Sequence, residues 1–138
     1  MKGLTINNLV VGQKSSFSKT ITETDVYMFA GISGDINPAH INEEYAKNTF
    51  FKGRIAHGML TGALISAVLG VQLPGPGTIY VSQALNFLAP VYFGDTITAT
   101  AEIKEILLEK SRVILETYCI NQNGVKVTSG EAVIIPPR

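Results

Sequence analysis

The sequence has little of the chemistry that marks several common classes of protein. Its single cysteine, Cys119, cannot form an internal disulfide, and no paired cysteine or histidine spacing suggests a structural zinc site. Eleven basic and eleven acidic side chains cancel at neutral pH, so no excess of positive charge favours nucleic acid or anionic lipid. These absences predict a protein of the reducing cytosol, with no nucleic-acid or membrane partner.

Segments suited to export or to a membrane span are also lacking. The polar start does not resemble a signal peptide, so we expect no export. The longest apolar run, at 59–73, contains Thr61, Gly62, Ser66 and Gly70 and is short for a bilayer. Because this run is apolar or small on every side, it predicts a helix surrounded by protein. With 138 residues, the chain is sized for one domain around one core.

Turn signals divide the chain into a helical first half and a strand-rich second half. Thr22 followed by Asp25 predicts a helix start, and Gly34 with Pro38 predicts its end. The first half is predicted to contain an edge strand at 16–21, a helix at 22–32, a rigid loop at 33–40 and a short helix capped by Asn42 at 43–47.

The second half alternates strand patterns with turn residues. Strands are predicted at 78–88, 96–106, 113–120 and 125–135. The turn sequences at 93–95 and 121–124 are short, which predicts an antiparallel meander. The fold class is therefore α+β: a single domain, residues 1–138, with an antiparallel sheet wrapped around a central apolar helix at 59–71. Such a sheet leaves edges that dimerisation could cover.

The candidate acid/base chemistry lies in the segments that flank the central helix. The chain has two histidines, His40 and His57, and Asp35 lies five residues before the first of them. Histidine titrates near neutrality, and a carboxylate can orient its ring, so Asp35 and His40 could face a common cavity. The alternative for the pair alone is that Asp35 caps a turn and His40 is a surface histidine.

A second motif, GRIAHGML at 53–60, places a glycine at the start of the central helix. Unpaired N–H groups at a helix start can stabilise negative charge on a carbonyl oxygen, and Gly58 would allow close approach. His57 could equally be a core histidine bonded to the backbone. Arg54 could steer a phosphate-bearing ligand or be simply solvated, and Cys119 is predicted to be a small buried hydrophobe.

Together these motifs resemble those of the MaoC-like, or (R)-specific enoyl-CoA, hydratases, which have the hot-dog fold. The resemblance includes GDINPAH at 34–40, IAHGML at 55–60, LPGPGTIY at 73–80 and NFLAPV at 86–91 followed by Gly94 and Asp95. It covers nearly the whole chain. The Gly53-Arg54 pair differs from the Arg-Pro that relatives often show there, which bears on loop shape and acyl selectivity.

The resemblance implies specific roles. Asp35 and His40 would hold one water, with His40 as the favoured base, and the Gly58 amide would bind the thioester carbonyl. Asn37 would support the loop, and Ser66 would lie near the pair, although a serine on a packed helix usually bonds back to the preceding turn. The substrate would be an acyl-CoA or an acyl group on acyl carrier protein. No metal or redox cofactor is implied, and the chain is expected to form a homodimer or a dimer of dimers.

Three other functions remain in view from the sequence. A dehydratase acting on 3-hydroxyacyl chains of acyl carrier protein would use the same pair in the opposite direction. A thioesterase would need a water aimed at the carbonyl carbon, which fits the motif less well. A non-catalytic acyl-thioester-binding subunit is opposed by the presence of both Asp35 and His40.

Overall fold

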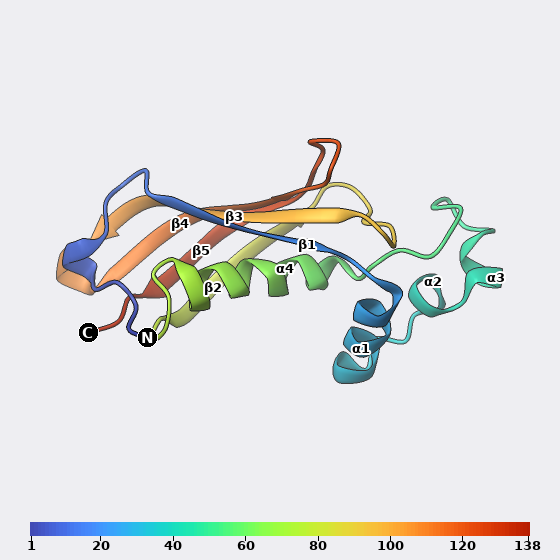
Figure 1. The fold of residues 1–138 in the computed structure, drawn as a ribbon, viewed down its shortest axis with the longest axis horizontal. Helices are drawn as coiled ribbons and strands as arrows, with labels where there is room; N and C mark the ends of the chain where they lie inside the picture. The colour runs from blue at the N-terminus through green and yellow to red at the C-terminus, as the bar shows by residue number, and fades with distance from the viewer.

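The computed structural model describes residues 1–138 and contains one sheet, a helix that runs along it and a group of helices beyond one end of it (Figure 1). The strands are β1 (Lys14–Thr20), β2 (Ile79–Phe87), β3 (Thr96–Leu107), β4 (Arg112–Ile120) and β5 (Lys126–Ile135). The helices are η1 (Ile6–Asn8), α1 (Glu23–Ser33), α2 (Pro38–Ile41), α3 (Glu43–Ala46), α4 (Gly58–Ala67), η2 (Val68–Gln72) and η3 (Leu108–Lys110). None of the helices is long and apolar enough to cross a membrane.

The antiparallel sheet has the order β1-β3-β4-β5-β2. Strands β3, β4 and β5 form the predicted meander, and β1 is an edge strand as predicted. The meander prediction is wrong for β2, which pairs with β5 at the opposite edge instead of with its successor β3. Residues 88–95 connect β2 to β3 across the end of the sheet, a long-range connection that local turn patterns do not encode.

Helix α4 lies along one face of the sheet (Figure 1). Its buried residues recur at helical spacing and form a single stripe: Thr61, Leu64 and Ile65, continued in η2 by Val68 and Leu69. Each fully buried Leu, Ile or Val side chain contributes roughly 1.5–3 kcal/mol of hydrophobic stabilisation. The apolar residues of this stripe and the inward-facing residues of the strands belong to one core cluster of 20 residues.

The expectation that protein surrounds the central helix on every side is wrong for the single chain. Met59 is 56% exposed and Val71 is 64% exposed, and Ser66 also lies on the open face. The sheet is one layer thick, so it covers only the stripe of α4 that faces it. The helix is therefore apolar both on the side that the sheet covers and on the opposite side, which this chain leaves exposed.

Helices α1, α2 and α3 project beyond one end of the sheet, at the end where α4 begins, whereas both termini lie at the other end (Figure 1). Helix α1 starts at Thr22 as predicted, and the start is a capping box: Thr22 accepts from the Asp25 amide and Asp25 accepts from the Thr22 amide. Gly34 ends α1 in the left-handed conformation, at φ 79°. Asn42 caps α3, also as predicted.

The predicted rigid loop at 33–40 is only partly a loop. Its last residues form the helical turn α2, so His40 lies on a helix and not in irregular chain. Pro38 is at the first helical position, where its fixed φ is favourable and its missing N–H costs nothing. Asn37 precedes it as a capping residue and accepts from the Ala39 amide at 3.1 Å. Only residues 34–37 therefore separate α1 from α2.

Candidate active site

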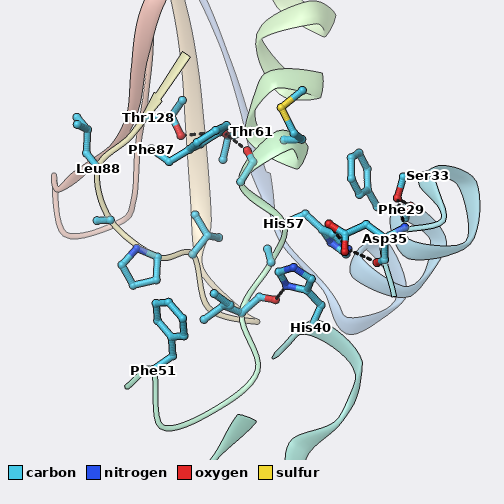
Figure 2. A pocket seen from close by; sticks show the side chains of 17 residues that line it. Phe29, Ser33, Asp35, His40, Phe51, His57, Thr61, Phe87, Leu88 and Thr128 are labelled. Carbon is cyan, nitrogen blue, oxygen red and sulfur yellow. Dashed lines mark hydrogen bonds and ion pairs between the residues drawn. The ribbon is translucent and has the colours of Figure 1, made fainter. Parts of the chain in front are cut away.

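One cavity of about 730 Å³ lies where the projecting helices meet the start of α4 (Figure 2). One part of its wall carries polar side chains, among them Asp35, His40 and His57. The opposite part is apolar and comes mainly from the end of β2 and the connection that follows: Phe87, Leu88, Ala89, Pro90 and Val91. A concave site with a few converging polar groups and an apolar wall is the usual form of a small-molecule site.

Asp35 and His40 are brought together, as the sequence predicted. Together with His57, each offers one ligating atom, and these atoms all lie within 4.8 Å of one another. His40 is 8% exposed, whereas the Asp35 side chain is 52% exposed. The pair therefore combines a buried ring on α2 with a carboxylate that solvent and substrate can reach.

The hydrogen bonds of His40 fix which ring nitrogen is free. Its Nδ1 lies 2.7 Å from the carbonyl oxygen of Ile55, and a carbonyl only accepts, so Nδ1 carries the proton. Nε2 has no hydrogen-bond partner in the protein and is not a fully buried atom. A neutral His40 thus presents an unprotonated Nε2, which is the state that a general base requires.

Gly58 is the first residue of α4 and lines the same cavity. The amide of a first helical residue has no partner within the helix, and that of Gly58 makes no backbone bond elsewhere. A Cβ at this position would lie 2.7 Å from the Phe87 ring, so only glycine fits without movement of that ring. The arrangement offers a free N–H at the positive end of a helix dipole, on a residue that lines the cavity.

The other two predicted site residues do not line the cavity. Asn37 holds the loop, since its side-chain Oδ1 caps α2 and its backbone N–H donates to Asp35 Oδ1 at 3.2 Å. Ser66 lies near the far end of α4 from Gly58, on the exposed face, and its proximity to the Asp35 and His40 pair stays a prediction.

A pair of threonines in the cavity wall was not predicted from the sequence. Thr61 and Thr128 form a buried hydroxyl pair at 2.7 Å in the cavity wall, and Thr61 also donates to the Gly58 carbonyl at 2.6 Å. The residues are 67 positions apart and belong to α4 and β5. Their individual sequence contexts carry no signal, because the pairing depends on how the helix is placed on the sheet.

Arg54 is neither a free phosphate-steering residue nor simply solvated. Its Nη1 lies 2.6 Å from Glu23 Oε1 and donates to the Tyr27 hydroxyl at 2.6 Å, while Nε lies 2.9 Å from Glu43 Oε2. The guanidinium also lies over the Phe93 ring, 4.8 Å from its centre. The hydrogen bond from Arg54 lowers the pKa of Glu23, and that bond likewise raises the pKa of Arg54. Arg54 therefore joins α1 and α3 beside the site.

The comparisons with known proteins agree with this geometry. Residues 7–122 match the model of the MaoC like domain. The chain belongs to the MaoC-like family. An (R)-specific enoyl-CoA hydratase of Rhodospirillum rubrum is 55% identical over 126 residues, which cover 91% of this chain and 87% of that protein.

Two further relatives cover almost all of this MaoC-like chain. A 3-hydroxybutyryl-CoA dehydratase of Methylorubrum extorquens is 44% identical over 138 residues, covering 100% of this chain and 87% of that protein. The solved structure of the unliganded R-hydratase PhaJ1 from Pseudomonas aeruginosa superposes with a TM-score of 0.94 at 48% identity, covering 99% of this chain and 87% of that one. The predicted hot-dog fold is thereby confirmed.

Proposed function

We propose that this MaoC-like chain is an (R)-specific hydratase that adds water reversibly to trans-2-enoyl-CoA. The observation that carries the proposal is one cavity that contains a carboxylate, a histidine with a free Nε2 and an unpaired helix-start amide. The names of the Rhodospirillum and Methylorubrum relatives support the hydratase and dehydratase directions of the same reaction. We therefore class the chain as a hydro-lyase.

In the proposed hydration, Asp35 and His40 bind one water between them. His40 Nε2 takes a proton from that water as its oxygen bonds to C3, and the C2–C3 double bond is lost to an enolate. The proton on His40 passes to the Asp35 carboxylate, which delivers it to C2, so both side chains return to their starting states. The net change is one water added, with no electron transferred, so we expect no metal or redox cofactor.

The Gly58 amide is proposed to stabilise the enolate oxygen. Negative charge develops there on the thioester carbonyl, and an N–H at a helix start points toward such an oxygen without having to reorganise. Donors of this kind are worth about 3 kcal/mol in the transition state. The apolar wall from Phe87 to Val91 would hold the acyl chain.

We also propose that the active form is a homodimer in the cytosol. Strand β2 is a sheet edge with exposed apolar residues, including Ile79 and Val81, which are 57% and 46% exposed. The open face of α4 carries Met59 and Ser66. A second copy could cover both surfaces at once, and size-exclusion chromatography with light scattering would reveal the dimer.

The test follows the absorbance of the enoyl thioester when crotonyl-CoA is added, with the chirality of the product determined. Wild type should form the (R)-alcohol, and Asp35→Asn and His40→Gln should each lower kcat by roughly two to four powers of ten. Glu109→Gln, in η3 away from the cavity, is a matched control for the loss of one carboxylate and should leave kcat unchanged.

The same assay separates the rival functions. Turnover of crotonyl groups on acyl carrier protein but not on CoA would favour the dehydratase of acyl carrier protein, and release of free CoA would favour a thioesterase. Binding of the thioester without turnover on either carrier would contradict the hydratase proposal and favour a binding subunit.

A further inference from the structure

We infer that His57 is a positioning residue that holds Asp35 at the water site through a hydrogen bond to its backbone. The inference rests on the proposed function, in which Asp35 and His40 act on the substrate. It assigns a role to the second histidine, which the reaction itself does not use. Figure 2 shows the two histidines with Asp35 and Phe29 beside them.

His57 makes its contact with Asp35 through one ring nitrogen. Nε2 lies 2.8 Å from the Asp35 carbonyl oxygen and 4.0 Å from Asp35 Oδ2. Because the carbonyl only accepts, Nε2 carries the proton. Nδ1 is buried without a partner, and a second N–H there would be a buried donor with nothing to bind. The hydrogen bonds thus fit a neutral His57 that donates to the main chain of Asp35.

This bond is the one connection between Asp35 and a distant part of the chain. The other hydrogen bonds of Asp35 are local: its amide donates to Ser33 Oγ, and its Oδ1 accepts from the Asn37 amide. Both partners are two residues away, so they shape the turn but do not fix its position relative to α4. The His57 bond spans 22 residues and connects the turn directly to the residue before Gly58.

The His57 ring also supports the His40 ring. The two rings stack with their centres 3.8 Å apart at an interplanar angle of 28°. The ring of Phe29 in α1 also lies beside His57, with the two ring centres 4.9 Å apart. His57 is 2% exposed and is the capping residue of α4, whose backbone is held by the helix. One rigid ring therefore contacts both members of the acid/base pair. A misplacement of about 1 Å in such a pair can lower the rate roughly 100-fold.

The hydrogen bond and the ring contacts can be separated by substitution. His57→Gln retains an amide N–H that reaches the Asp35 carbonyl but loses the ring faces. His57→Phe retains the ring faces and loses the donor. His57→Asn is polar but one carbon shorter than glutamine, so its amide does not reach the carbonyl. The inference predicts that activity follows the donor, in the order Gln above Asn and Phe.

The experiment measures kcat and KM of the full chain with crotonyl-CoA, and melting temperature for each variant. We expect His57→Phe and His57→Asn to lose about 100-fold in kcat, with KM within about threefold of wild type, while His57→Gln stays within about tenfold. If kcat instead follows the melting temperature, or if Gln is as impaired as Phe and Asn, His57 has a structural role only and the inference fails.

Hydrogen exchange at 33–37 gives a second readout that does not depend on activity. The inference predicts faster hydrogen exchange in this turn for His57→Phe and His57→Asn than for wild type and His57→Gln. The exchange rates of α4 should be the same in all four proteins. Equal exchange in all four proteins would overturn it. If wild type is inert but the exchange pattern holds, the proposed function fails and the tether between His57 and Asp35 stands.

Discussion

The buried threonine pair should show an asymmetry that follows from which hydroxyl holds which proton. Thr61 uses its single hydroxyl proton to donate to the Gly58 carbonyl, so in the pair Thr128 must donate and Thr61 must accept. Both side chains are at most 2% exposed, so water does not replace a lost partner. Valine has nearly the shape of threonine, so substitution changes hydrogen bonding with little change of volume.

Thr61→Val removes a side-chain donor to the Gly58 carbonyl, which stays bonded within the helix, and leaves the Thr128 hydroxyl buried without an acceptor, at a cost of about 2 kcal/mol. Thr128→Val removes one donor and leaves the Thr61 bond to Gly58 intact, at about 1 kcal/mol. In the double variant no hydroxyl is left unpaired, so its cost should not exceed that of Thr61→Val alone.

Urea unfolding of the four proteins checks the prediction, with thermal melting as a second measurement. For a domain of this size, 1 kcal/mol corresponds to about 3–5 °C in melting temperature. Equal destabilisation by the two single substitutions, or costs that add in the double variant, would refute the proton assignment. Turnover should fall more in Thr61→Val than in Thr128→Val, because only the first substitution removes a hydrogen bond to Gly58, the proposed oxyanion donor.

Three further predictions concern single residues. Gly58→Ala should lower kcat with the fold retained, since its Cβ would meet the Phe87 ring at 2.7 Å; unchanged kcat would show that the ring moves aside at no cost. Cys119 should not react with a thiol reagent until the protein unfolds, because burial raises its pKa to about 12; rapid labelling of the native protein would contradict this. Arg54→Met should lower the melting temperature above pH 4.5, the ordinary pKa of Glu23. This difference from wild type should shrink as the pH falls through the lowered pKa of Glu23 in the folded state, because protonation of Glu23 removes the ion pair. A difference independent of pH would contradict the role of the ion pair.

Local patterns were sufficient to predict most of the elements. The four strands of the second half were predicted nearly to their ends, because alternation and turn residues are both short-range signals. The helix start at Thr22 and the cap at Asn42 were predicted for the same reason. The position of β2 in the sheet was not, since its pairing with β5 depends on a chain reversal that no neighbouring residue specifies.

The site was predicted in part. Asp35, His40 and Gly58 lie within motifs whose residue types already suggest their chemistry, and all three line the cavity. His57 was weighed as a core histidine bonded to the backbone, and its partner proved to be a backbone carbonyl, but the identity of that carbonyl requires the folded chain. The ion pairs of Arg54 were not predicted, because its partners are 11 to 31 residues away.

The placement of the acid/base pair has a consequence for how this protein could change. Asp35 and His40 both belong to 27–55, which projects beyond the sheet and contributes none of the buried residues of the main core cluster. The Gly58 amide, by contrast, belongs to the helix that the sheet holds. Insertions or replacements within 27–55 can therefore alter or remove the reactive side chains while the sheet and helix stay intact. Replacement of that segment, by natural variation or by design, could give a different reaction on the same thioester-binding framework.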